Sequence, residues 1–400
     1  MKKALRKIHL WLSVPTGIII TLVCFSGAML VFEKEITEAI KPELYFVKEA
    51  KGEPIPMQQL MEKVEETLPD SVSISGVTVF ADSTRTYQVS LSKPRRASIY
   101  VNQYTGEVTG RSERLPFFNT MFHLHRWLLG SSSGVGKLIT GICTLVLVFI
   151  LITGILMWLT NRNKPLKASL AIHVTKGWGR FWHDLHVAGG IYTTIFLLAM
   201  ALTGLTWSFS WYRTGFYACF GVESSEKGGA HGEGGNSHGE GKGSHGEGRG
   251  SRGEGRYTHG DGRNNHEGKR GEGRGFHRRS PYRHWDDVLN EVALKNPGYQ
   301  QITLKPEVAE VVPEGRLSMR AADKYSYDRR SGEITDVQLY SAGKKDTKVR
   351  SGVYMVHTGS WGGIITRILN FLAAFIGATL PLTGYWLWFR RKRAAIAHHH

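Results

Sequence analysis

Two apolar stretches, IHLWLSVPTGIIITLVCFSGAMLVF at residues 8–32 and LHVAGGIYTTIFLLAMALTGLTWSF at residues 185–209, align with each other without a gap. The alignment places His9 against His186 near the start of each stretch. An apolar helix of this length crosses a hydrocarbon core of about 30 Å, because each residue adds about 1.5 Å. The match therefore predicts two equivalent transmembrane helices in a duplicated chain.

Residues 138–159 and 364–389 form a second matching pair of apolar stretches. Each follows a histidine, His125 or His357, and a glycine-rich segment, and each contains the pattern TG-x-x-x-W. The four predicted spans contain no acidic residue and a single arginine, Arg367. They exclude a soluble cytoplasmic enzyme, although a hydrophobic content of 41% leaves room for large polar segments.

The net charge of +17 is concentrated around the ends of the predicted spans. Thirteen lysines and arginines lie within residues 1–9, 160–182 and 389–400, and these segments contain no acidic residue. The positive-inside rule predicts that both termini and the 160–182 loop are cytoplasmic and that the two long connections are outside. The orientation of the spans in the membrane thus accounts for the positive charge, and nucleic-acid binding is not expected.

The two long connections repeat as well. Residues 56–69 and 285–297 show apolar positions at helical spacing and end at a proline. The runs QVSLS, ASIYVNQYTGEVTG and RLSMRAADKYSYDRRSGEITDVQLY read as strands, with turns at Thr105-Gly106 and Ser331-Gly332. We expect a membrane protein with an α-helical four-span bundle and two small α+β extracytoplasmic domains, related by internal duplication.

The expected units follow one another along the chain. They are transmembrane helix 1 (1–36), the first small domain (37–116), an interfacial segment with transmembrane helix 2 (117–160), a cytoplasmic loop (161–182), transmembrane helix 3 (183–213), an insertion (223–280), the second small domain (281–346), an interfacial segment with transmembrane helix 4 (347–393), and a tail (394–400) whose final histidines resemble part of a purification tag.

The insertion at 223–280 consists mainly of Gly, His, Glu and Arg, with a recurring HGEG unit. Such a composition cannot bury a core, so disorder is predicted. Weak metal capture by its histidines is one interpretation and a solvated, expandable insertion is the other. The second is favoured, because a flexible chain provides no fixed ligand geometry.

Four histidines recur at equivalent positions of the two halves. His9 and His186 begin spans at the predicted cytoplasmic face, and His125 and His357 precede spans at the outer face. A histidine pair at each face of a helical bundle meets the requirement for axial ligation of an iron porphyrin. Any haem is non-covalent, because the chain has no CxxCH motif. His183 and His123 are alternative ligands, and an interfacial histidine can also be a simple amphipathic side chain.

Other residues near the spans have two interpretations each. Arg6, Arg126 and Arg367 could pair with haem propionates, since guanidinium matches carboxylate geometry, or could anchor lipid headgroups. The glycines of the spans, among them Gly27 and Gly204, could serve a cofactor or ordinary helix packing.

The chain resembles the PepSY-associated transmembrane helix family. The resemblance rests on the basic, His- and Trp-containing first span, the paired small domains and the closing TG-x-x-x-W-x-R-R segment, and it covers nearly everything except 223–280. It implies an inner-membrane, iron-regulated protein or ferric-siderophore reductase of Gram-negative bacteria. It also implies two b-type haems, with His9, His186, His125 and His357 as axial ligands of the haem iron.

The expected function is a haem-dependent membrane ferric reductase that passes electrons outward to iron held by a chelator or siderophore. No GxGxxG fingerprint follows a strand, so the cytoplasmic electron donor is expected to be another protein or a diffusible reductant. The alternative is a non-enzymatic scaffold whose outer domains bind peptides or regulate a peptidase. A metal permease fits less well, because the spans carry no carboxylate or histidine at mid-depth.

Overall fold

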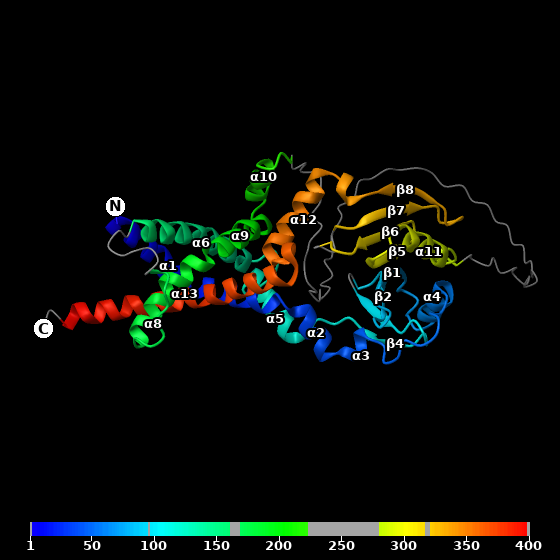
Figure 1. Cartoon of the computed structure of the whole chain (residues 1–400), viewed down its shortest axis with the longest axis horizontal. Coiled ribbons are helices and arrows are strands. Elements are labelled where there is room, and N and C mark those ends of the chain that lie inside the picture. The colour runs from blue at the N-terminus through cyan, green and yellow to red at the C-terminus, as the bar shows by residue number, and fades with distance from the viewer. Residues whose placement is uncertain (1, 95–96, 161–168, 223–279, 317–320, 398–400) are drawn as a thin grey trace, which may run out of the picture.

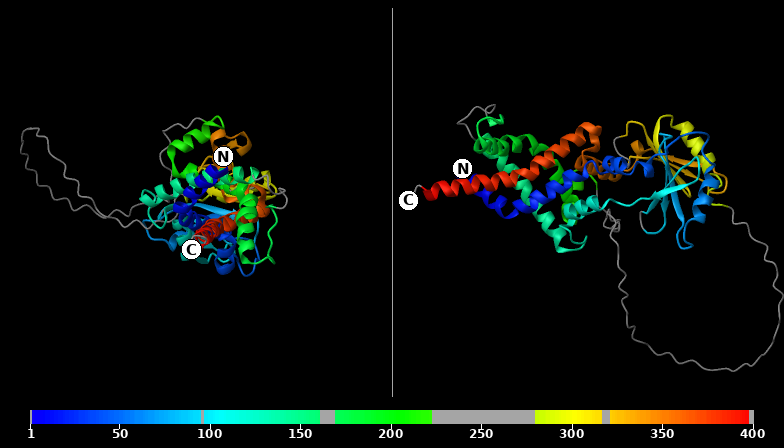
Figure 2. Two further views of the ribbon diagram at one scale, coloured as in Figure 1. Left: turned by 90° about the vertical axis from the view of Figure 1, so that its left-hand side faces the viewer. Right: turned by 90° about the horizontal axis from the view of Figure 1, so that it is seen from below.

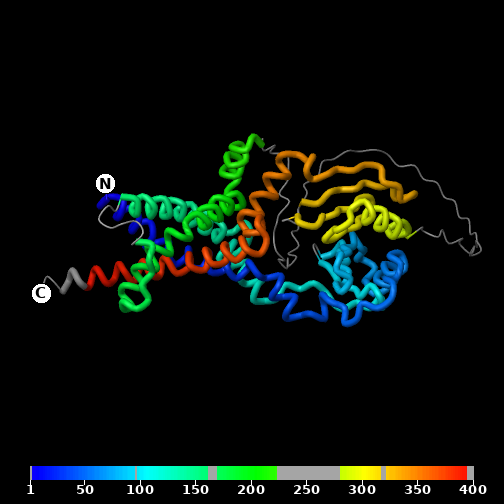
Figure 3. Tube along the Cα trace, in the orientation of Figure 1, coloured from blue at the N-terminus to red at the C-terminus, as the bar shows by residue number. Residues whose placement is uncertain are grey.

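A helical bundle and a β-sheet domain make up the structure (Figure 1). The computed structural model describes residues 2–94, 97–160, 169–222, 280–316 and 321–397. The predicted disordered insertion therefore lies, apart from Ser280, outside the described residues. The sheet domain extends from one end of the bundle, and both chain termini lie at the other end (Figures 2 and 3).

Within the described part of the chain, four long apolar helices form the bundle. They are α1 (Lys2–Leu30), α6 (Val135–Leu159), the continuous run Trp178–Ser208, and α13 (Gly363–Ala397), which follows a short 3-10 turn. Between 17% and 33% of the most apolar window of each helix is buried inside the protein, so most of this apolar surface faces outward. Water would disfavour such a surface and lipid accepts it. The chain is a multi-pass membrane protein, as predicted.

The third span differs from its predicted bounds of 183–213. It begins earlier, with α8 (Trp178–Asp184), passes through a π-helical turn η1 (Leu185–Gly189) and continues as α9 (Gly190–Ser208). Phe209 is extended (φ −127°, ψ 128°), and a separate helix α10 (Ser210–Ala218) follows. The apolar composition continues across Phe209, so hydropathy alone does not reveal this change of direction.

One eight-stranded antiparallel sheet combines both predicted small domains. Its strand order is β4-β3-β2-β1-β5-β6-β7-β8, so each half is a meander and the halves meet at β1–β5. The strands are β1 (Ile74–Phe80), β2 (Tyr87–Leu91), β3 (Ser98–Val101), β4 (Val108–Arg111), β5 (Tyr299–Lys305), β6 (Val308–Pro313), β7 (Asp323–Tyr327) and β8 (Ile334–Gln338). Thr78 pairs with Thr303 across the junction, and their hydroxyls are 2.9 Å apart.

Two helices from different halves share one core against this sheet. Apolar side chains of α4 (Met57–Glu66) and α11 (Trp285–Lys295) pack together with those of strands from both halves. The Asp286 carboxylate accepts a 2.8 Å hydrogen bond from the Met57 backbone N–H, at the positive end of α4. The two predicted α+β units are thus present, and they are fused by a common sheet and core.

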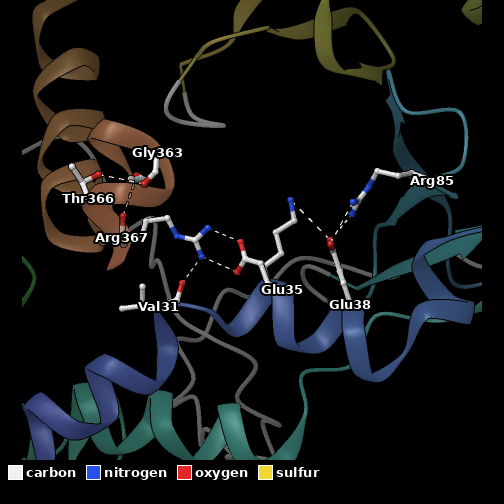
Figure 4. A network of polar contacts seen from close by, with 10 residues as sticks. Val31, Glu35, Glu38, Arg85, Gly363, Thr366 and Arg367 are labelled. Carbon is white, nitrogen blue, oxygen red and sulfur yellow. Dashed lines mark hydrogen bonds and ion pairs between the residues drawn. The ribbon is translucent and has the colours of Figure 1, made fainter. Parts of the chain in front are cut away.

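Among the described residues, five helices lie between the sheet domain and the spans. They are α2 (Glu33–Ile40), α3 (Pro42–Tyr45), α5 (Pro116–Trp127), α10 and α12 (Lys345–Thr358). On α2, Glu35 binds Arg367 of α13, whereas Glu38 binds Arg85 beside β2 (Figure 4). These ion pairs tie the first half of the sheet domain to the fourth span.

Candidate functional site

Two histidine pairs lie at opposite ends of the bundle. His9 on α1 faces His186 on η1, with ring centroids 6.4 Å apart and planes at 89°. His125 on α5 faces His357 on α12, with centroids 6.1 Å apart and planes at 54°. We call them the terminal-side pair and the domain-side pair. The structure therefore brings together the partners that the repeat predicted, one from each half.

The terminal-side pair is held by spans two and four. His9 Nδ1 lies 3.0 Å from the Thr153 hydroxyl of α6. His186 Nδ1 lies 2.9 Å from the Thr383 hydroxyl and 3.1 Å from the Leu380 carbonyl of α13. His186 also stands on the π-helical turn, a local irregularity that is common at functional sites. The Nδ1 atoms of His9 and His186 are thus both in contact with polar groups of the neighbouring spans.

The domain-side pair is held by spans one and three. His125 Nδ1 donates to the Val23 carbonyl over 2.9 Å. His357 Nδ1 lies 2.9 Å from the Met200 carbonyl and 3.2 Å from the Thr203 hydroxyl. Burial lowers the pKa of His125 and that of His357, which keeps both imidazoles neutral at neutral pH. Neutral imidazole is the form that ligates metals.

The geometry of both pairs fits an iron between two imidazoles. A metal–imidazole bond is about 2.0 Å long and the ring centroid lies about 1.1 Å behind the nitrogen, so in-line ligation separates two centroids by about 6.2 Å. The observed separations, 6.4 Å and 6.1 Å, match that distance. Within the described ranges no group of three or more His, Cys, Asp or Glu side chains could hold a metal ion. The candidate iron ligands are therefore the two histidine pairs.

The alternative histidines have contacts of their own. His183 Nδ1 lies 3.3 Å from the carboxylate of buried Asp184, which also binds His173 and Arg180 at 2.7 and 2.8 Å. His123 packs edge-on against Trp127, with centroids 5.0 Å apart, and its Nε2 is buried with no partner in the described part of the chain. The contacts given for His183 and His123 are thus with Asp184 and Trp127, whereas the facing rings of the two pairs include His186 and His125.

The three predicted arginines differ in their surroundings. Arg6 is exposed near the start of α1. Arg126 lies 5.5 Å from the Phe122 ring centroid and 5.6 Å from that of Trp127. Arg367 donates to Glu35 at 2.5 and 2.8 Å and to the Val31 carbonyl at 2.5 Å. A propionate would have to compete with Glu35 for Arg367.

The sequence did not assign a role to the hydroxyl groups beside the pairs. Thr153, Thr203 and Thr383 contact three of the four imidazoles, and the Trp207 ring stands edge-on to His357 at 5.0 Å. The repeated TG pattern was the available signal for two of these threonines. Its contact with histidine could not be inferred, because it depends on how the spans pack.

Together, the fold and the two pairs define a duplicated four-span membrane protein with a fused sheet domain at one end. The chain matches the family model described as PepSY-associated TM region over residues 6–391, and it belongs to that family, as predicted. No curated protein matches the chain.

Proposed function

We propose that the protein is a di-haem transmembrane electron-transfer protein that reduces ferric iron held by a chelator, in particular a siderophore. The observation that carries the proposal is the presence of two facing histidine pairs at opposite ends of the bundle, with centroid separations suited to bis-imidazole iron. Hydrogen bonds from the spans occupy Nδ1 of all four rings and leave Nε2 for the metal.

Each non-covalent b-type haem would supply reversible one-electron Fe(III)/Fe(II) chemistry. His9 and His186 would hold one iron, and His125 and His357 would hold the other. The apolar spans around each pair limit water access and thereby influence the reduction potential. Reduction suits iron release, because Fe(II) binds hard oxygen chelators more weakly than Fe(III) does.

The proposed location is the bacterial inner membrane, with both termini in the cytoplasm and the sheet domain in the periplasm. The cations near the terminal end of the bundle support this orientation through the positive-inside rule. Electrons from a cytoplasmic donor would then enter at the terminal-side pair. The domain-side pair would lie toward the ferric chelate.

Haem stoichiometry and electron transfer test the proposal directly. Purified protein should show a Soret band and sharp α-bands after dithionite reduction, with about two haems per chain by pyridine haemochrome. In proteoliposomes, addition of an external ferric siderophore should reoxidise the reduced haems and form Fe(II), trapped by ferrozine. Iron-free siderophore is the control.

A folded, colourless preparation would overturn the proposal and leave the peptide-binding scaffold as the better explanation. If the protein holds two haems but no ferric chelate reoxidises them, the proposed reductase activity is wrong and the proposed haem binding stands.

A further inference from the structure

All four paired histidines face the same local arrangement on a neighbouring span. Opposite each imidazole stands a Ser-Gly or Thr-Gly dipeptide. The four dipeptides are Ser26-Gly27 facing His125, Thr153-Gly154 facing His9, Thr203-Gly204 facing His357, and Thr383-Gly384 facing His186. Each span therefore contributes one dipeptide, which we call a cradle.

In every cradle the hydroxyl lies within hydrogen-bond distance of the carbonyl three residues earlier. The hydroxyl–carbonyl distances are 3.1 Å for Ser26 to Val23, 2.9 Å for Thr153 to Ile150, 3.1 Å for Thr203 to Met200 and 2.8 Å for Thr383 to Leu380. The Ser26 and Thr203 hydroxyls are closer still, at 2.6 Å, to the carbonyls of Leu22 and Ala199, four residues earlier. Three of the carbonyls three residues earlier, those of Val23, Met200 and Leu380, accept hydrogen bonds from the histidines that face them, whereas His9 Nδ1 contacts the Thr153 hydroxyl. The recurrence of a hydroxyl residue and a glycine opposite all four imidazoles, on both types of span in the repeat, indicates a shared requirement rather than incidental packing.

The carbonyl beside each of His125, His186 and His357 decides the tautomer of that histidine, because a carbonyl oxygen can only accept a hydrogen bond. Nδ1 of these three rings must therefore carry the ring proton, and the Nε2 lone pair is free for a metal.

The glycines control how close the spans come to the imidazoles. A Cβ added to Gly27 would lie 2.8 Å from Cε1 of His125, and one added to Gly204 would lie 3.1 Å from Cε1 of His357. A Cβ added to Gly384 would lie 3.3 Å from Cε1 of His186, whereas one added to Gly154 would lie 3.6 Å from Cε1 of His9. A methyl group would therefore push His125 aside and leave His9 in ordinary contact.

We propose that the four cradles are positioning elements that hold each imidazole as the Nδ1–H tautomer with Nε2 directed at haem iron. The proposal rests on the haem function proposed above and deepens it. A hydrogen bond donated from Nδ1 raises the basicity of the ligand. Loss of that bond should weaken haem binding and raise the midpoint potential of the haem that the histidine holds.

The first experiment compares Thr383→Val with Thr383→Ser in the full-length protein. Valine should weaken binding of one haem by about 10- to 100-fold and raise its potential, whereas serine should restore wild-type values. Thr379→Val is the matched control, because the Thr379 hydroxyl donates to Ile376, three residues earlier, in the same way, with no described histidine contact. Readouts are haem titration, redox potentiometry and the low-spin EPR spectrum.

The second experiment uses the graded glycine contacts. Gly27→Ala should shift the EPR signal of one haem or remove that haem, and Gly154→Ala should resemble wild type. If wild-type protein holds two haems but Thr383→Val matches Thr383→Ser, and Gly27→Ala matches Gly154→Ala, the cradles do not position the ligands. If wild-type protein holds no haem, the underlying function is wrong.

Discussion

His125 and His357 stand in opposite halves of the chain, yet their rings face each other at 6.1 Å. Each ring is anchored by a span of its own half, His125 by Val23 and His357 by Met200. The duplication therefore supplies both the two rings and the two anchors. Each bis-imidazole site therefore needs one ring from each half of the chain.

Removing one histidine of a pair should remove one haem. His186→Ala and His357→Ala should each reduce pyridine haemochrome from about two haems per chain to about one, because bis-imidazole ligation needs both partners. His183→Ala and His123→Ala are the matched controls, since these neighbouring histidines contact Asp184 and Trp127. Retention of both haems in either pair variant, or loss in either control, would contradict the assignment.

Thiol labelling can test the orientation of the chain. Cys219, at the end of α10, is exposed, whereas Cys24 and Cys143 are buried. A membrane-impermeant maleimide should label Cys219 in intact spheroplasts, because α10 lies at the sheet-domain end of the bundle (Figure 1). In a Cys219→Ser background, Arg393→Cys should react only after permeabilisation. The opposite pattern would invert the proposed topology.

The junction between the half-sheets should be sensitive at Gly76. A Cβ there would lie 2.7 Å from the Leu304 carbonyl oxygen of β5. Gly76→Val should therefore destabilise the sheet domain by roughly 1–3 kcal/mol. Ser75→Val is the control, because Ser75 is the exposed neighbour on the same strand. Urea unfolding followed by near-UV circular dichroism would measure the difference, and equal midpoints would show that the junction tolerates the side chain.

The Glu35–Arg367 pair should make stability depend on pH. The Arg367 guanidinium holds the pKa of Glu35 below its ordinary value of 4.5. A lowered carboxyl pKa contributes stability above about pH 4.5, and this contribution is lost as the pH falls through the lowered value. Because Glu35 is 45% exposed, the pair should contribute no more than about 1 kcal/mol.

Glu35→Gln should therefore be slightly less stable than wild type at pH 7, and the difference should vanish at low pH. Glu49→Gln changes a glutamate whose ion pair with Lys51 is largely exposed to solvent, so it should match wild type closely throughout. Thermal melts across this pH range measure the comparison. If Glu35→Gln were less stable than wild type by the same amount at low pH, the shape of the side chain, rather than its charge, would stabilise the contact.

Much of the fold could be read from local patterns. Uninterrupted apolar length gave the four spans, and the helical spacing at 56–69 and 285–297 corresponds to α4 and α11. The sequence stretches that we read as strands did not include β1, β5 or β6, the strands at and beside the junction. β1 is buried at nearly every position, so it lacks the alternation that marks a half-exposed strand.

The sequence alone determined which histidines are equivalent, because duplication preserves spacing and hydropathy along the chain. It also determined the number of spans, since the transfer of apolar side chains into lipid depends on composition and length. Only the tertiary structure decided that His186, rather than His183, faces His9, and that Thr383 and Leu380 hold its Nδ1. It likewise decided that Arg367 binds Glu35. The physical reason is that helix rotation, the π-helical turn and strand-edge pairing arise from contacts between distant segments, which no local periodicity records.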